Sequence, residues 1–157
     1  HASGRSTVLI IDEAQNLAPA VLEQIRLLTN LETEKRKLLQ IVLFGQPELD
    51  RKLAEPSVRQ LLQRIAFHYR LSGLAREEVG NYLAHRLRVA GYRGESVFGS
   101  RAIRCLHRAS RGTPRLLNIL AHKALLAVYG EGKHAVGASH VRQAAVDTEG
   151  AASAGWW

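Results

Sequence analysis

The sequence predicts an α/β fold in which an incomplete parallel sheet precedes a small all-helical domain. In residues 1–72, short apolar runs alternate with helical patterns, as is typical of a parallel sheet. After that point the pattern is helical throughout. The 157 residues suffice for one ordinary domain or two small ones. We therefore expect an α/β part over residues 1–72, a helical part over 73–149 and a flexible tail over 150–157.

Three strands are predicted in the α/β part. Thr7–Ile11 is an apolar run without alternation, which suits a strand buried on both faces. Residues 38–44 have the same character and end at Gly45. In residues 65–71 large apolar or aromatic side chains alternate with Ala66, His68 and Arg70, which predicts a third strand. Three strands are few for a parallel sheet, so we expect this sheet to be incomplete.

The helices of the α/β part follow from proline positions and periodicity. A helix is predicted over residues 19–33, since Pro19 suits a first turn and apolar residues recur at helical spacing. The run ETEKRK at residues 32–37 predicts a charged turn. Two further short helices are expected to begin near Gln46 and at Pro56.

Four helices are predicted in the helical part. Glu77 and Glu78 in a first turn complement the helix dipole. Thr113 and Ser139 are candidate N-caps of the third and fourth helices. The predicted ranges are 75–90, 99–111, 114–130 and 139–147.

The chain is basic, with a net charge of +8 and a pI near 10.2. Residues 1–72 hold 10 Lys/Arg and 8 Asp/Glu, and residues 73–157 hold 12 and 6, so the second half carries most of the charge. This balance suits an anionic partner, and it equally suits an arginine-rich soluble surface. One predicted helix face could contact nucleic-acid phosphates, an acidic partner or water, and it carries Arg101, Arg104, Arg108 and Arg111.

Several classes of protein are disfavoured by composition. Cys105 is the only cysteine, so an intrachain disulfide is excluded and a reducing cytosol fits. No apolar run approaches the roughly 18–20 residues of a membrane helix. The first residues lack the apolar segment of a signal peptide. The seven histidines show no paired metal-ligand spacing, which makes a zinc site improbable.

Two adjacent carboxylates, Asp12 and Glu13, follow the first predicted strand. Parallel strands deliver their last residues to the edge of the sheet where ligands bind. An acid there can hold magnesium through its water shell, and a second carboxylate can deprotonate an attacking water. Because adjacent strand residues point opposite ways, one can face the metal and the other the water. The alternative is a strand end followed by a helix-capping acid.

Motifs along the chain resemble those of the AAA+ ATPases, most closely the branch with the ExeA/GspA secretion ATPases and the MshM pilus-biogenesis ATPases. IIDEAQNL resembles their Walker B motif, and LFGQPEL resembles the next strand and turn. Later segments resemble the helical lid and its sensor 2 helix. The resemblance covers about residues 6–149. It implies an incomplete P-loop NTPase core followed by a lid domain.

The resemblance also implies roles for individual residues. Asp12 would be the acid of the magnesium site, and Glu13 the base that activates water. Gln46 would be sensor 1, touching the water or the γ-phosphate of ATP; the alternative is a turn residue. Arg64 resembles the arginine finger, with Arg59 as second choice.

Arg115 in the GTPR run resembles sensor 2. In the first turn of a helix, its guanidinium would add to backbone groups that already favour a phosphate. For Arg64, Arg59 and Arg115 alike, a solvated surface arginine is the alternative.

The phosphate-binding G-x-x-x-x-G-K-[ST] loop is absent from the 157 residues. The run Gly130-Glu131-Gly132-Lys133 lacks the spacing and follows a predicted helix, so we interpret it as a loop. The chain therefore resembles the C-terminal portion of an ATPase without its Walker A loop. We expect this portion to bind ATP weakly or not at all.

The intact protein is expected to use ATP and magnesium, to form a homo-oligomer and to serve secretion or type IV/MSHA pilus assembly. It would act in the cytoplasm, at the inner-membrane face, with envelope secretion or pilus-assembly proteins as partners. Trp156 and Trp157 could touch a membrane or belong to a disordered end. Two alternatives remain: a DNA-acting ATPase of the transposition type, and a non-catalytic interaction module.

Overall fold

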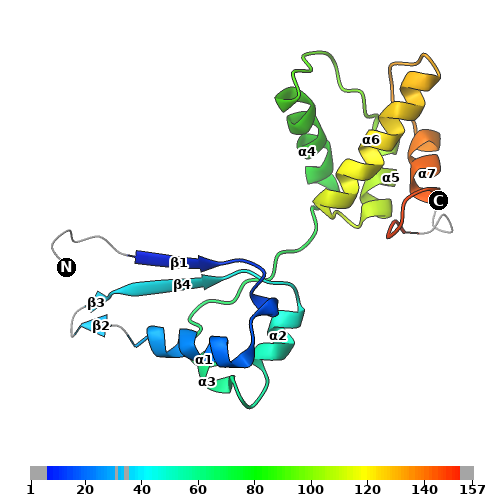
Figure 1. The fold of residues 1–157 in the computed structure, drawn as a ribbon. Helices are drawn as coiled ribbons and strands as arrows, with labels where there is room; N and C mark the ends of the chain where they lie inside the picture. Colours follow the sequence, from blue (N-terminus) through cyan, green and yellow to red (C-terminus); the bar gives the residue numbers. More distant parts are fainter. Residues whose placement is uncertain (1–6, 31, 34–35, 153–157) are drawn as a thin grey trace. The chain divides into compact units, whose positions relative to one another are not determined.

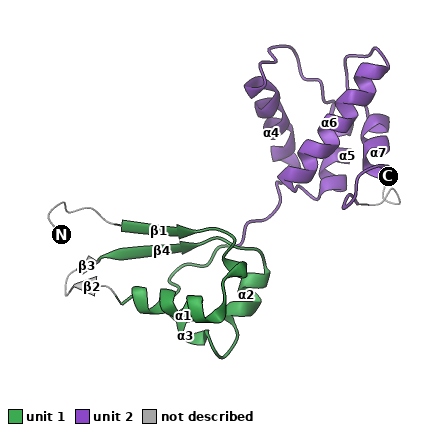
Figure 2. Ribbon diagram, in the orientation of Figure 1, with its two compact units in different colours: residues 1–69 green, residues 70–157 purple. Residues whose placement is uncertain are grey.

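The chain consists of two compact units, each with its own apolar core (Figure 2). The computed structural model describes residues 7–30, 32–33 and 36–152. The first unit spans residues 1–69 and contains the strands, and the second spans residues 70–157 and contains four helices.

The first unit is built on a two-stranded parallel sheet. Strand β1 (Thr7–Ile11) pairs with β4 (Leu39–Leu43), in a register that runs from Thr7 opposite Leu39 to Ile11 opposite Leu43. Both predicted strands and their parallel arrangement are confirmed. The parallel register brings the carboxyl ends of the two strands to the same edge.

Three α-helices pack on one face of this sheet (Figure 1). They are α1 (Pro19–Leu28), α2 (Glu48–Leu53) and α3 (Arg59–Leu62), and a short 3₁₀ helix, η1 (Ala14–Asn16), precedes them. Helix α1 begins at Pro19 as predicted but ends at Leu28, five residues early. Buried side chains from all four elements meet the inner face of the sheet, including Ala14, Leu22, Ile25, Leu49, Leu53 and Leu61.

The other face of the sheet is open, which corrects the prediction of a strand buried on both sides. Val8 is 48% exposed, Ile10 is 62% exposed and Val42 is 38% exposed. The three helices all lie on the opposite face, so no described element of this unit covers these side chains. An apolar patch of this kind usually marks a surface that another polypeptide covers.

One further prediction for this unit is refined, and another is wrong. The predicted charged turn at residues 32–37 contains a small antiparallel pair, β2 (Glu32–Thr33) with β3 (Arg36–Lys37). The predicted third strand at residues 65–71 has no regular structure, and Phe67 is 94% exposed. A strand needs a neighbour for its backbone hydrogen bonds, and within the described residues none pairs with this segment.

The second unit is a four-helix domain, as predicted. Its helices are α4 (Arg76–Val89), α5 (Ser100–Ser110), α6 (Pro114–Gly130) and α7 (Ala138–Val146). Each begins and ends within one or two residues of its predicted bounds. Fully buried side chains from all four helices form the core, including Val79, Leu106, Leu117, Leu120 and Val141.

The helix caps differ from prediction in two places. Thr113 occupies the N-cap of α6, but its side chain makes no capping hydrogen bond. The N-cap of α7 is Gly137 rather than Ser139, and the Gly137 N–H donates to Nδ1 of His140 at 2.9 Å. At α4 the acidic first turn acts as expected, since Oε2 of Glu78 accepts the Ala75 N–H at 2.7 Å.

The end of the described chain is attached to the helical unit. Ala151 packs against its core, and the Ala152 N–H donates to the Ala109 carbonyl at 2.9 Å. The predicted flexible tail is therefore wrong for residues 151–152. Trp156 and Trp157 lie outside the described residues. Across the described ranges, no helix combines the length and apolar character needed to cross a membrane.

Candidate functional site

The carboxyl ends of β1 and β4 bring three of the predicted site residues to one edge. Asp12 and Glu13 directly follow β1, and Gln46 lies three positions after β4. Two backbone bonds hold the strand ends together beyond the ladder: Phe44 N–H to the Ile11 carbonyl (2.8 Å), and Ala14 N–H to the Phe44 carbonyl (2.9 Å). The predicted convergence of carboxylates and amide at this edge is observed.

The backbone turns sharply at the two carboxylates. Glu13 has φ 52° and ψ 36°, a left-handed conformation that costs a non-glycine residue roughly 1–2 kcal/mol. Oδ1 of Asp12 accepts the Glu13 N–H at 2.8 Å, which supports this turn. Glu13 stands at the N-cap of η1, but its side chain makes no capping hydrogen bond, and the N-cap of α1 is Ala18. The alternative of a helix-capping acid is therefore met by position at η1 and not by a side-chain bond.

The side chain of Gln15 connects the residues after β1 to those after β4. The sequence did not lead us to predict it as a site residue. Its Nε2 donates to Oε2 of Glu13 at 2.5 Å, while its Oε1 accepts the backbone N–H of Gln46 at 3.1 Å. One side chain thus links the carboxylate after β1 to the backbone after β4. The available signal was an amide two positions after a carboxylate in a turn, close enough to reach back to it.

The main chain around Gln15 is held by hydrogen bonds from Lys52, and the Gln15 side chain packs closely against Gly45. Nζ of Lys52, on α2, donates to the Gln15 carbonyl at 2.5 Å and to the Leu17 carbonyl at 2.8 Å. Gly45 leaves room for the amide, since a Cβ there would lie 3.1 Å from Oε1 of Gln15 and 2.8 Å from Cδ2 of Leu49. A side chain at position 45 would therefore force the Leu49 or Gln15 side chain to shift.

Within the described residues, no three His, Cys, Asp or Glu side chains gather as direct metal ligands, so a magnesium ion at this edge would be held mainly through water. Asp12, Glu13 and Gln46 are all exposed, so solvated ions can reach them. Within the described ranges, each of the two carboxylates has one oxygen bonded to the protein, which leaves the second available. Carboxylate oxygens that act through bound water are the ligands that magnesium prefers.

The predicted arginines lie elsewhere. Arg64 is exposed in the turn after α3, and Arg59 is exposed as the first residue of α3. Within the described part of the chain, neither guanidinium has an ion-pair partner. Arg115 is the second residue of α6 in the helical unit and is also exposed. Arg59 and Arg64 belong to the first unit together with the two carboxylates, whereas Arg115 belongs to the second unit.

Comparisons with known proteins agree with this architecture. The family described as an AAA domain matches residues 1–53, which include β1, the carboxylates and Gln46. General secretion pathway protein A of Aeromonas hydrophila is 46% identical over 156 residues, which are 99% of this chain and 28% of that protein. The chain is thus similar over nearly its whole length to General secretion pathway protein A, and its first third matches the AAA domain family. It spans just over a quarter of that relative's length.

Solved AAA+ structures share the fold of this chain. The RuvB Holliday junction branch migration motor of Thermotoga maritima superposes with a TM-score of 0.63 over 87% of this chain and 43% of that chain, at 18% identity. The ORC2 protein of Aeropyrum pernix gives 0.64 over 94% and 40%, at 15% identity. At such identities the similarity concerns the fold alone. The predicted α/β P-loop NTPase core with a helical lid is confirmed.

Similarity to the AAA domain family implies nucleotide and magnesium binding in general. The individual roles of Asp12, Glu13, Gln46, Arg64 and Arg115 remain predictions.

Proposed function

We propose that this chain is the C-terminal portion of an ATPase module in a larger protein, which hydrolyses ATP to drive secretion or type IV/MSHA pilus assembly. The observation that carries the proposal is the strand edge where Asp12, Glu13 and Gln46 meet. The 46% identity to a secretion-pathway protein over nearly the whole chain supports the biological setting.

In the proposed mechanism, the carboxylates divide two tasks. Asp12 would hold a magnesium ion through its water shell, and magnesium bound there would supply positive charge beside the phosphates. Glu13 accepts a proton from the attacking water. The Gln15 amide orients the Glu13 carboxylate, and the side-chain amide of Gln46 contacts the water or the γ-phosphate. The exposed second oxygens of both carboxylates support these roles.

Arginines supply the positive charge in this proposal. Arg64, or else Arg59, reaches the nucleotide of a neighbouring subunit and stabilises charge on the transferred phosphoryl group. The absence of an ion-pair partner among the described residues supports a role in trans. Arg115 binds phosphate at the start of α6 as sensor 2. The intact protein would then be a homo-oligomer, because the finger serves another subunit.

The phosphate-binding loop must come from polypeptide outside these 157 residues. The uncovered apolar face of the sheet supports this, because Val8, Ile10 and Val42 would be buried by further core elements. The unpaired segment at residues 65–69 supports it too, since its alternating pattern suits a strand with a missing neighbour. We expect this chain alone to bind ATP weakly or not at all. Calorimetric titration showing micromolar magnesium–ATP binding would contradict this expectation.

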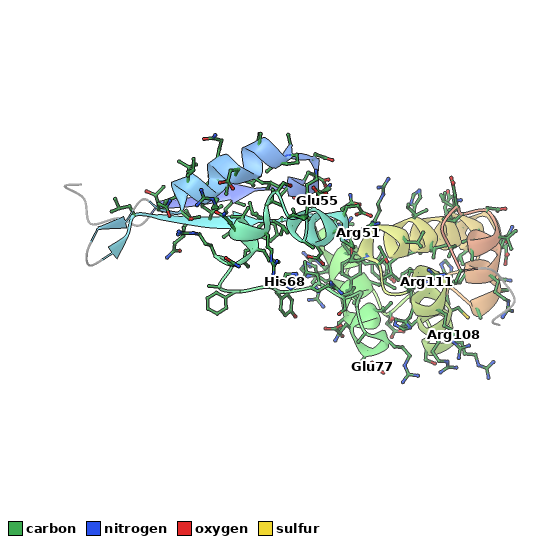
Figure 3. All side chains as sticks on the ribbon, turned by 90° about the horizontal axis from the view of Figure 1, so that it is seen from below. Arg51, Glu55, His68, Glu77, Arg108 and Arg111 are labelled. Carbon is green, nitrogen blue, oxygen red and sulfur yellow. The ribbon has the colours of Figure 1, made fainter. Side chains whose placement is uncertain are left out.

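An ATPase assay on a chain extended upstream to include the phosphate loop tests the catalytic proposal. Glu13→Gln removes the base and is expected to lower kcat by roughly 10²- to 10⁴-fold. Glu55→Gln is the matched control, because Glu55 is an exposed carboxylate of the same unit (Figure 3). If Glu13→Gln hydrolyses ATP like the unmodified protein, the catalytic role is wrong.

The clients are proposed to be envelope secretion or pilus-assembly proteins, with the ATPase in the cytoplasm at the inner-membrane face. The 46% identity to General secretion pathway protein A supports clients of the secretion type. Genes for secretion or pilus components beside this gene would agree with it. A neighbouring transposase gene would instead favour a DNA-acting ATPase.

A further inference from the structure

The exposed side of α5 carries a row of arginines. Arg101, Arg104 and Arg108 lie on α5, and Arg111 follows at its C-cap; all four are exposed. We call these four residues the α5 arginine face (Figure 3 labels Arg108 and Arg111). The proposed ATPase function gives this face no task.

Helix geometry aligns the arginines. At 3.6 residues per turn, Arg101, Arg104 and Arg108 fall within an arc of about 60°, and the rise of 1.5 Å per residue spreads them over roughly 10 Å. The opposite side of α5 is fixed in the core by Ala102 and Leu106, which are 1% and 0% exposed. The guanidinium groups are therefore directed away from the core.

Little negative charge compensates this face. Residues 96–130, which include α5 and α6, contain no Asp or Glu but hold six Arg or Lys. The pKa of Glu77, at the start of α4, is lowered chiefly by a hydrogen bond to its own backbone, then by Arg76, and least by His107 of α5. Glu77 is already engaged by its own neighbour, because its Oε1 lies 3.0 Å from Arg76. Arg108 already has an interaction of its own, whereas Arg101, Arg104 and Arg111 have no ion-pair partner among the described residues and give this face its positive local potential.

Helix stability does not explain the arrangement. Arg101 lies in the first turn of α5, where the helix dipole disfavours a cation by about 0.3–1 kcal/mol, and no acid occupies that turn. A helix optimised only for stability and solubility would place Asp or Glu there and alternate both signs. A row of one sign starting at the unfavourable end points to an anionic partner.

The chemistry of the surface selects among anionic partners. No large apolar side chain of α5 is exposed; Ile103, Cys105 and Leu106 all pack against the core. Protein interfaces and membrane-binding helices usually need apolar anchors, and single-stranded nucleic acids need aromatic side chains for stacking. The phosphate backbone of a duplex needs only correctly spaced positive charge, and guanidinium groups bind phosphate through two parallel hydrogen bonds.

We propose that the α5 arginine face binds the phosphate backbone of duplex nucleic acid without reading its sequence. This interaction involves the helical unit alone and does not depend on ATP hydrolysis.

Salt-dependent binding to a fluorescein-labelled 20-base-pair DNA duplex, measured by fluorescence anisotropy with the 157-residue chain, tests the proposal. Four phosphate contacts predict a slope of log K against log salt near −3.6, or about a 150-fold loss of affinity between 50 and 200 mM NaCl. The variant Arg101→Gln/Arg104→Gln/Arg111→Gln should keep a slope near −0.9 and lose only about 3.5-fold over the same range. At 50 mM NaCl it should bind at least about tenfold more weakly than the unmodified chain.

A charge-matched control separates this face from net charge. Arg86→Gln/Arg88→Gln/Arg142→Gln removes three exposed arginines from α4 and α7 of the same unit, and it should retain the unmodified slope. Equal slopes for the two triple variants would overturn the proposal. So would equally tight binding to polyglutamate, to phosphatidylserine vesicles or to a single strand, which would indicate another class of partner.

Circular dichroism verifies that both variants fold. If Arg101→Gln/Arg104→Gln/Arg111→Gln does not fold, the unmodified chain still tests the proposal. A slope of log K against log salt between 0 and −1 would contradict four phosphate contacts.

Discussion

Replacing Gln15 by alanine is expected to uncouple the Glu13 carboxylate from the end of β4 while the first unit stays folded. The substitution removes the hydrogen bond to Oε2 of Glu13 and the acceptor for the Gln46 N–H. The Lys52 bond to the Gln15 main-chain carbonyl remains, because it does not use the side chain. The strand-end bond between Phe44 and Ile11 also remains.

The expected magnitude follows from these two bonds. A typical hydrogen bond contributes about 0.5–1.5 kcal/mol net, and Gln15 is only half-buried, so unfolding should become easier by about 1 kcal/mol. Locally, loss of the acceptor should speed amide exchange of Gln46 by about 2- to 12-fold, which is the same energy expressed as an opening equilibrium. Exchange rates of amides within the β1–β4 ladder should change only by the amount that the lower free energy of unfolding accounts for.

Hydrogen exchange followed by NMR separates the two bonds through a second variant. Gln15→Glu keeps an oxygen that accepts the Gln46 N–H, but it loses the donor and places a second negative charge beside Glu13. Protection of Gln46 should therefore survive in Gln15→Glu and fall in Gln15→Ala. Asn16→Ala is the matched control, since it truncates the neighbouring polar side chain of η1.

Unchanged protection of Gln46 in Gln15→Ala would refute the reasoning. So would an equal loss in Asn16→Ala, because the effect would then arise from η1 in general rather than from the amide bridge.

Three further predictions concern the helical unit. Leu117→Ala should lower the free energy of unfolding by about 2–5 kcal/mol in urea titrations, because Leu117 is fully buried, whereas Leu126→Ala, at a 57% exposed site, should change it by less than about 0.5 kcal/mol. Gly112→Ala should cost at least about 1–2 kcal/mol, because Gly112 has φ 73° and a Cβ would lie 2.2 Å from a backbone carbonyl oxygen; an unchanged urea midpoint would contradict this. The Lys133 ammonium and then the His140 ring lower the pKa of Glu131 below its ordinary 4.5, so their contribution to stability is present above pH 4.5 and lost as the pH falls through the lowered value. Glu131→Gln should therefore flatten the acid limb of stability as the pH falls below about 4.5, while Glu149→Gln, at an exposed carboxylate, should leave that limb intact.

Local chemistry was enough to predict much of this protein from its sequence. Apolar runs predicted β1 and β4, and proline, glycine and acidic first turns predicted the helices of the second unit within one or two residues, while the end of α1 was misplaced by five. The parallel pairing followed from the alternation of strands and helices, so the convergence of Asp12, Glu13 and Gln46 was predictable too. These features depend on contacts between near neighbours in the chain or on a single rule of topology.

Tertiary structure alone decided the features that depend on a distant partner. Residues 65–71 have the pattern of a strand, yet they remain unpaired because no neighbouring strand is present to bond their backbone. Val8 and Ile10 are as apolar as a doubly buried strand requires, yet they are exposed because all three helices pack on the other face. The Gln15 bridge was equally hidden in the sequence, since its second bond spans 31 positions and forms only when β1 and β4 lie side by side.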